Sequence, residues 1–243
     1  RGLGDVYKRQ REKTSNYLLR QAFAHAIDRE RILEQVLFGL GRVAAAPINK
    51  GIEWAHRSGT LANYDFNQDK ANQLLDQARF SRSGDGVRMS LDIVHFPRFN
   101  KYAEVMKQDL AQVGINLISR PMDRSAAVDT IFNQRDFDLN LISYCNGADP
   151  DIGVKRMYVS SNIGNIPFSN ASAYRNPEID TLFKEAGQTS DIQQRSTKYS
   201  QIQTILAEEL PYWWLVETQS LTAHRSDMSN FRSWSGNFAV MAQ

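Results

Sequence analysis

The sequence predicts an α/β fold with a mainly parallel sheet flanked by helices. Stretches with apolar residues at helical spacing alternate along the chain with short stretches in which apolar and polar residues alternate. Between residues 91 and 145 the order is strand, helix, strand, helix, strand, which requires crossover connections and therefore predicts parallel neighbours. The stretch 137–145 is rich in Leu and Ile, as expected of a central strand buried on both faces.

The first third of the chain predicts helices. Apolar residues at helical spacing span 19–27, and Asp28 is the expected N-cap of a second helix that carries the apolar residues of 32–37. After a long loop, Asp65 and Gln68 have the spacing of a capping box in front of a third apolar stripe. Helices are therefore expected to precede the first strand of the alternating region.

In the middle third, the breaks between elements are easy to place. Gly114 ends a helix, Pro121 ends the second strand, and Asp123 is positioned to cap the helix that follows. In order, the expected elements are a strand at 91–95, a helix at 102–113, a strand at 115–118, a helix at 127–132 and a strand at 137–145.

The last third is more helical. The Asn-Pro pair at 176–177 predicts a helix start with proline in the first position. Ser190 and Gln193 again have capping-box spacing, for a helix that ends before Pro211. A final strand is expected at Tyr212–Val216.

Composition limits the possible functions. The 243 residues include 29 basic and 27 acidic side chains, a net charge of +2, which argues against a dedicated nucleic-acid binder. The single cysteine, Cys145, cannot form an internal disulfide. Apolar runs such as Leu210–Val216 are far shorter than the ~20 residues that a membrane helix needs. A chain of this composition can bury a sizeable core.

Residues 1–10 are expected to be foreign to the protein. Asp5–Gln10 resembles the translation of a transposon-end adaptor used in sequencing libraries. On this interpretation residues 1–10 are an adaptor scar, the natural chain begins upstream, and a signal peptide is missing together with that upstream part. The alternative is an ordinary polar N-terminal segment.

Motifs for catalysis, cofactors and metals are absent from the sequence. We find neither a phosphate-binding loop nor a nucleophile elbow, and the four histidines are scattered without helical metal-ligand spacing. We therefore expect no catalytic residue, no cofactor and no local metal site. A metal site assembled from distant parts of the chain stays open at this point.

The most informative loop is 144–151. It directly follows the expected central strand, at the edge of the sheet where ligands bind in open α/β folds. It contains an aromatic ring, a thiol, an amide and two carboxylates. Asn146 and Asp149 fit a ligand site and an Asx-rich turn equally well, whereas Asp151 fits a helix cap better.

Several segments of the chain resemble one known family. Arg20–Glu30 resembles the R-Q-A-…-A-I-D-R segment of the family 5 extracellular solute-binding proteins, the peptide, nickel and opine receptors of bacterial ABC importers. The resemblance depends on a series of short matching segments that occur in the same order as in the family, between about residues 17 and 214. The further matches are Ala46–Ile48, Tyr64-Asp65 before Lys70-Ala71, Leu110–Ile115, Phe137–Leu139, Asp149–Asp151, Tyr174–Asp180 and Ile205–Pro211.

The resemblance implies a periplasmic-binding-protein-like fold, in which two α/β lobes close on a ligand. Residues 11–210 would form the second lobe, and 211–243 a C-terminal segment that crosses back to a missing first lobe. The implied protein is a periplasmic, monomeric component of an ABC importer. It would capture a peptide-like, opine-like or similar small solute by hinge closure and deliver it to permease subunits in the inner membrane.

The resemblance also implies ligand-binding residues, namely Tyr144, Cys145, Asn146, Asp149 and Trp54. Tyr144 stands where relatives carry an aromatic wall of the ligand site, and Trp54 is the expected lid residue. In peptide-binding members an Asp four residues before the loop proline takes the ligand amine, whereas this chain has Asn146. An amide supplies no counter-charge, so peptide binding of that type would require Asp149 to take over the cation.

The expected absence of the first lobe leads to two structural expectations. The loop 144–151 should be exposed to solvent and should bind its ligand weakly. The aromatic residues Tyr212, Trp213 and Trp214 should lack partners and form an exposed apolar patch.

A second function remains open on the residues alone. An α/β hydrolase or transferase could use Asp149 or Asp151 as its base, with His95 or His56 brought near by folding. The ordered family series favours the receptor. A ligand that raises the melting temperature without being turned over would distinguish the two.

Overall fold

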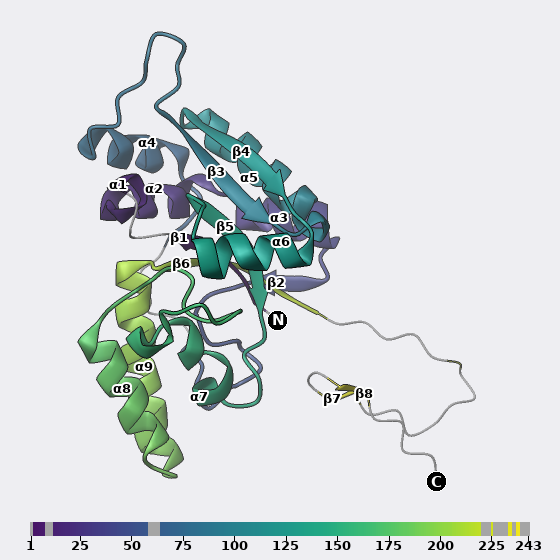
Figure 1. Ribbon diagram of the computed structural model, residues 1–243, viewed down its shortest axis with the longest axis vertical. Helices are drawn as coiled ribbons and strands as arrows, with labels where there is room; N and C mark the ends of the chain where they lie inside the picture. Colours follow the sequence, from purple (N-terminus) through teal and green to yellow (C-terminus); the bar gives the residue numbers. More distant parts are fainter. Residues whose placement is uncertain are drawn as a thin grey trace.

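The backbone of this computed structural model is built on a six-stranded sheet with strand order β2-β6-β1-β5-β3-β4 (Figure 1). The structure describes residues 2–7, 12–57, 64–219, 225, 233–234 and 237–238. The strands of the sheet are β1 (Gly2–Tyr7), β2 (Gly41–Val43), β3 (Met89–His95), β4 (Ile115–Pro121), β5 (Leu139–Tyr144) and β6 (Tyr212–Thr218). A separate antiparallel pair consists of β7 (Ser233–Trp234) and β8 (Asn237–Phe238).

The half of the sheet formed by β5, β3 and β4 is parallel. Leu91 of β3 pairs with Leu117 of β4, and His95 of β3 pairs with Leu141 of β5. The helix α5 (Asn100–Gln112) connects β3 to β4 as the expected crossover. The predicted α/β class, with a parallel sheet flanked by helices, is therefore confirmed. The carboxyl ends of these three strands lie along one edge.

The other half of the sheet is antiparallel, which the sequence did not predict. The backbone of β1 pairs antiparallel with β5 on one side and with β6 on the other, and β2 pairs antiparallel with β6. Strand β5 consequently lies inside the sheet, between β1 and β3, as its run of Leu and Ile predicted. The expected role of residues 1–10 as an adaptor scar stays a prediction.

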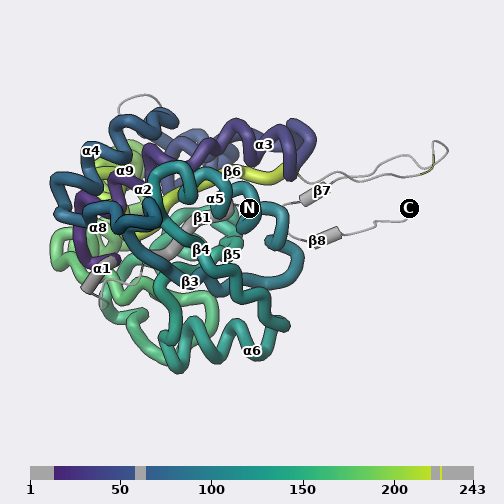
Figure 2. The backbone as a smooth tube through the Cα atoms, turned by 90° about the horizontal axis from the view of Figure 1, so that it is seen from above, coloured from purple at the N-terminus to yellow at the C-terminus, as the bar shows by residue number. Residues whose placement is uncertain are grey.

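Helices cover both faces of the sheet (Figures 1 and 2). Helices α2 to α5 lie on one face and α6 on the other, while α8 and α9 pack side by side at lower left in Figure 1. The remaining α-helices are α1 (Glu12–Ser15), α2 (Tyr17–Ala26), α3 (Arg29–Leu37), α4 (Gln68–Gln77), α6 (Arg124–Val128), α7 (Pro150–Gly153), α8 (Pro177–Gly187) and α9 (Ile192–Glu209). Shorter helical turns are η1 (Pro97–Phe99), η2 (Asp129–Gln134), η3 (Lys155–Met157) and η4 (Ser160–Asn162).

The helix caps agree with the sequence at some positions and differ at others. The side chains of Asp28, Asp123 and Asn176 accept hydrogen bonds from backbone N–H groups in the first turns of α3, α6 and α8, as predicted. Helix α4 is capped by Asn67 instead of Asp65, and α9 by Asp191 instead of Ser190. In both cases the helix begins later than the capping-box spacing suggested, so the residue next to the first turn makes the bond.

The expected exposure of the last strand is wrong. The exposed fractions of Tyr212, Trp213 and Trp214 are 0%, 3% and 6%. Strand β6 is enclosed because β1 and β2 pair with its two edges. The indole Nε1 of Trp214 donates a hydrogen bond to the Tyr158 hydroxyl at 3.0 Å, and the Arg29 guanidinium lies 4.2 Å from the Trp213 ring centre.

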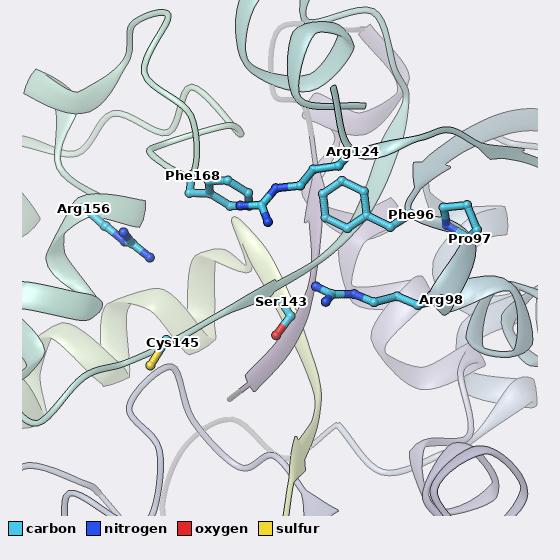
Figure 3. Close-up of a pocket in the computed structure, with 8 residues that line it drawn as sticks. All are labelled: Phe96, Pro97, Arg98, Arg124, Ser143, Cys145, Arg156 and Phe168. Carbon is cyan, nitrogen blue, oxygen red and sulfur yellow. The ribbon is translucent and has the colours of Figure 1, made fainter. Parts of the chain in front are cut away.

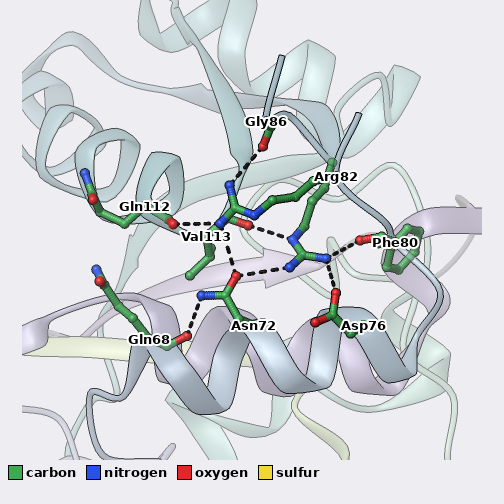
Figure 4. A network of polar contacts seen from close by, with 9 residues as sticks. Gln68, Asn72, Asp76, Phe80, Arg82, Gly86, Gln112 and Val113 are labelled. Carbon is green, nitrogen blue, oxygen red and sulfur yellow. Dashed lines mark hydrogen bonds and ion pairs between the residues drawn. The ribbon is translucent and has the colours of Figure 1, made fainter. Parts of the chain in front are cut away.

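Two arginines join α4 to the end of α5 at the amino-terminal edge of the parallel strands (Figure 4). Arg88 donates to the carbonyl oxygens of Val113 and Phe80 and pairs with Asp76 at 2.5 Å. Arg82 donates to the carbonyl oxygens of Gly86 and Gln112. The Arg88 side chain is only 4% exposed, so its hydrogen bonds are sheltered from water.

We expect Arg88→Ala to lower the free energy of unfolding by about 1.5–3 kcal/mol, because the substitution removes a charged donor from buried carbonyl oxygens. Arg82→Ala is the matched control, since its side chain makes similar bonds while exposed, and it should cost about 1 kcal/mol or less. Urea unfolding followed by circular dichroism measures both. Equal losses for the two variants would contradict the role assigned to burial.

Candidate functional site

A pocket of about 470 Å³ opens at the edge where the parallel strands end (Figure 3). Residues 96–98 follow β3, Arg124 follows β4, and Ser143 and Cys145 belong to the end of β5. The crossover topology therefore brings residues from three separate parts of the sequence to one place. This is the edge at which open α/β sheets bind ligands.

Three arginines dominate the lining. Arg98 lies in η1, Arg124 is the first residue of α6, and Arg156 lies in η3. Figure 3 shows Arg98 and Arg124 extending from one side of the pocket and Arg156 from the opposite side. None of the residues that line the pocket is acidic. The pocket consequently presents concentrated positive charge in a chain whose net charge is only +2.

Aromatic rings hold these guanidinium groups. The Arg98 guanidinium carbon lies 4.7 Å from the centre of the Phe99 ring, and that of Arg124 lies 5.5 Å from the centre of the Phe168 ring. The Arg156 guanidinium carbon lies 5.8 Å from the Tyr144 ring centre. Contact with an aromatic face attracts the cation without neutralising it, and it uses none of the N–H donors in the guanidinium plane.

These arginines have no counter-ion in the part of the chain that the structure describes. Among the side chains that the structure describes, no carboxylate lies within ion-pair distance of Arg98, Arg124 or Arg156. The Nε atom of Arg156 is buried and has no hydrogen-bond partner there. A buried donor without a partner is costly, and an anion that enters the pocket could satisfy it.

Tyr144 lies beneath the pocket and does not form its wall. Its ring is 2% exposed and its hydroxyl donates to the carbonyl oxygen of Ser169 at 3.0 Å. Burial raises the pKa of the Tyr144 hydroxyl well above its usual value, so it remains a neutral donor. The expectation that the whole loop 144–151 is exposed is thus wrong for Tyr144 and for Pro150, because both pack into the core.

Cys145 and Asn146 have different environments although they are neighbours. The Cys145 thiol is exposed and lines the pocket. The Asn146 side-chain oxygen accepts a hydrogen bond from the Asn49 backbone N–H at 2.6 Å. Helix α7 approaches this loop closely, since a Cβ atom at Gly153 would lie 1.9 Å from the Asn146 carbonyl oxygen. Asn146 therefore helps to fix the loop against the segment that follows β2.

Asp149 is already paired within the chain. Its two carboxylate oxygens accept hydrogen bonds from Arg195 at 2.7 and 2.8 Å, and one of them also caps α7 by accepting from the Asp151 N–H. Hydrogen bonds from Arg195 lower the pKa of the Asp149 carboxyl group. Trp54 belongs to the same cluster, because the Arg195 guanidinium carbon lies 4.8 Å from the Trp54 ring centre. The structure thus brings Asp149 and Trp54 together around Arg195.

The side chains that could act as catalytic groups in the enzyme alternative also have hydrogen-bond or ion-pair partners within the chain. The two ring nitrogens of His95 contact the Ser119 hydroxyl at 2.7 Å and the Phe96 carbonyl oxygen at 3.0 Å. Burial lowers the pKa of the His95 ring. Nδ1 of His56 contacts the Ile48 carbonyl oxygen at 2.7 Å, and Asp151 pairs with Lys155 at 2.9 Å. These contacts do not connect a histidine to either aspartate.

Within the described residues, no group of three or more His, Cys, Asp or Glu side chains is arranged to hold a metal ion. In the same part of the chain, no helix combines the length and the apolar character that a bilayer crossing requires.

Sequence reasoning missed the pocket arginines. The rule that ligands bind beyond the carboxyl ends of strands applies to the residues after β3 and β4 as well as to the loop after β5. Arg98 and Arg124 each stand three residues beyond the last residue of a parallel strand, which is a usable signal. Arg156 and Phe168 carry no such signal, because only the folded loops after α7 bring them to the pocket.

Comparisons with known proteins agree with this fold. The family model described as "Bacterial extracellular solute-binding proteins, family 5 Middle" matches residues 6–165. The chain is 30% identical over 227 residues to the oligopeptide-binding protein AppA of Bacillus subtilis, covering 88% of this chain and 41% of that protein. It is 26% identical over 214 residues to the heme-binding protein A of Haemophilus influenzae, covering 85% of this chain and 37% of that protein.

A solved structure shows the same arrangement. The AppA protein of Bacillus subtilis in complex with a nonapeptide superposes with a TM-score of 0.81 at 27% identity, over 89% of this chain and 44% of the other. The chain spans about two fifths of the length of the curated relatives that it matches.

Proposed function

Because this chain belongs to the bacterial extracellular solute-binding proteins of family 5, we propose that it is the substrate-binding component of an ABC importer. It captures a small solute outside the cytoplasm and delivers it unchanged to a membrane permease. The observation that supports this most directly is the pocket at the carboxyl ends of the parallel strands. Its arginines have no carboxylate partner in the described part of the fold, so their charge is available to a ligand.

The mechanism is closure of two lobes around the solute. The family resemblance implies that residues 11–210 form one α/β lobe and that 211–243 cross back to the other, although β6 lies in the same sheet as β3, β4 and β5 in this structure. The pocket supplies one wall of the closed site, and the second lobe covers it by a hinge motion. Closure stabilises the bound state because it removes the solute from water, and opening at the permease releases it.

The solute, location and partners follow from the same membership. Relatives include a protein named for oligopeptide binding and one named for heme binding, so the solute is a small molecule, peptide-like or of similar size. We place the protein in the periplasm as a monomer that meets the permease subunits in the inner membrane. Cys145 contacts the solute, and Tyr144 contributes by holding Arg156. Asn146, Asp149 and Trp54 position the loop beside it.

The enzyme alternative is not favoured. A general base needs a free lone pair within hydrogen-bond reach of its substrate. The carboxylate of Asp149 is held by Arg195, and both ring nitrogens of His95 are engaged. We therefore propose a binding protein without catalytic activity.

A solute binding experiment tests this function. We expect a bound solute at 100 times its Kd to raise the free energy of unfolding by about 2.7 kcal/mol, which corresponds to a rise in Tm of about 5–11 °C for a chain of this size. Thermal unfolding against a panel of short peptides and small carboxylates measures the rise. Mass spectrometry of the recovered solute provides the control, since its mass should be unchanged. A product whose formation disappears in Asp149→Asn would overturn the receptor assignment.

A further inference from the structure

We propose that the solute of this pocket carries at least two carboxylate groups, and that Arg98, Arg124 and Arg156 bind them. This inference rests on the proposed function and makes its substrate class specific. It follows from four features, which are the charge of the pocket, the placement of its cations, the space between them and the occupation of the nearby carboxylates.

The first feature is uncompensated charge. Three guanidinium groups line one pocket that contains no acidic residue, and none of the three has an ion-pair partner among the described side chains. Cations gathered in this way repel one another, and a bound anion removes that repulsion. A neutral solute would leave this repulsion in place.

The second feature is the placement of the cations. Arg98 and Arg124 reach into the pocket from one side and Arg156 from the other (Figure 3). A solute with a carboxylate at each of two ends can pair with both sides of the pocket at once. The planar guanidinium group matches a carboxylate with two parallel hydrogen bonds, which is why arginine suits this task.

The third feature is the space between the charges. Phe96 and Phe168 contribute apolar surface to a volume of about 470 Å³, which is within the range typical of small-molecule sites. These rings fit the carbon skeleton that joins the two carboxylates. The ligand class is therefore a compact molecule with anionic ends and an apolar middle.

The neighbouring loop offers no free anion to a cationic ligand. The Asp149 carboxylate is bound on both oxygens by Arg195, and the Asn146 side-chain oxygen accepts from the Asn49 backbone. Asp151 is paired with Lys155, so a solute with a positive end would find repulsion at the arginines and no unpaired carboxylate in this loop to offset it. The charge of the site therefore favours anionic solutes over cationic ones.

The test uses Cys145, which is the single cysteine of the chain and lines the pocket. N-ethylmaleimide, an uncharged reagent, labels the thiol, and intact-mass measurement gives the labelling rate. The probes are propane-1,2,3-tricarboxylate, the acidic dipeptide N-acetyl-Glu-Glu and the neutral dipeptide amide N-acetyl-Gln-Gln-NH2, both acetylated so that neither carries a charged amine. The first two distinguish a non-peptide from a peptide source of the carboxylates, and the third has a similar shape without acidic side chains or a free carboxyl end.

We expect at least one acidic probe to slow the labelling of Cys145 and to raise Tm, while the neutral amide does neither at the same concentration. The affinity for the acidic probe should fall about tenfold or more in each of the variants Arg98→Gln, Arg124→Gln and Arg156→Gln, because each removes a charge-assisted hydrogen bond. Arg156→Lys should recover part of the affinity. Arg79→Gln is the matched control, since Arg79 is exposed and follows α4 at the opposite edge of the parallel strands.

The possible outcomes distinguish a failure of the anionic substrate class from a failure of the receptor function. Equal protection of Cys145 by the acidic and neutral probes, unchanged in the arginine variants, would overturn the anionic substrate class while the receptor function stands. Protection by neither acidic probe nor by the neutral amide, with no change in Tm, would count against the receptor function at this pocket and against the substrate class with it. Preferential protection by one acidic probe supports the class and identifies its source.

Discussion

Trp214→Ala should lower the free energy of unfolding by about 3–5 kcal/mol, the largest effect expected of any substitution considered for this protein. The Trp214 side chain is 6% exposed in β6, and its indole Nε1 donates a hydrogen bond to the Tyr158 hydroxyl. Removing it leaves a cavity in the core and takes a donor away from the buried Tyr158 hydroxyl. Urea unfolding monitored by circular dichroism gives the change.

Two further variants separate the contributions. Trp214→Phe keeps most of the ring and loses the hydrogen bond, so it should cost clearly less than Trp214→Ala. Tyr158→Phe removes the acceptor of that bond and should cost about 1 kcal/mol. If Trp214→Ala changed stability by less than about 0.5 kcal/mol, as surface substitutions do, the strand would be exposed after all.

Asp149→Ala should lower the free energy of unfolding by about 3–4 kcal/mol. The ion pair with Arg195 is bidentate, with side chains that are 28% and 15% exposed, and removing one partner of a sheltered pair costs about 3 kcal/mol. Loss of the α7 cap adds about 1 kcal/mol. Asp149→Asn retains a cap and loses the charge, so its cost should be smaller by about that amount.

The cost of removing this charge should depend on pH. Hydrogen bonds from Arg195 place the pKa of Asp149 in the folded chain below its unfolded value of about 3.9. The stability from the pair is therefore fully present above the unfolded value and is lost as the pH falls through the lower folded pKa. The difference in unfolding free energy between wild type and Asp149→Asn should be constant from about pH 5 to 8 and should shrink below about pH 4.

A nearby surface pair provides the control. Asp151 and Lys155 are paired at 2.9 Å with both side chains 33% exposed, one helical turn apart. Asp151→Ala should cost about 0.5 kcal/mol or less, as exposed pairs of this spacing do. A cost for Asp149→Ala no greater than that of Asp151→Ala would contradict the structural role assigned to Arg195.

Local signals in the sequence predicted the local parts of the fold. Asp28 and Asn176 were identified as caps because a cap depends only on the residues of one helical turn. The parallel order of β3, β4 and β5 followed from their crossovers. The antiparallel neighbours β1, β2 and β6 were not predicted as a group, because their pairing joins segments about 170 to 215 residues apart and leaves no local pattern.

The candidate site was predicted only in its location. The rule that ligands bind beyond the carboxyl ends of strands pointed to the edge at which Cys145 and the pocket lie. The same rule could have identified Arg98 and Arg124, but nothing in the sequence indicates that Arg156 faces them. Nor does the sequence show that Arg195 forms an ion pair with Asp149, since these two residues are 46 positions apart.

The three pocket arginines stand on three separate crossover loops, and this has a consequence for how the protein can be altered. A loop can be exchanged or mutated while the sheet that holds the other two remains intact, although effects at the three arginines are not expected to add, because they share one ligand. Directed evolution of the preferred solute can therefore proceed one loop at a time. Intermediates along such a route would keep their fold while their selectivity changes in small steps.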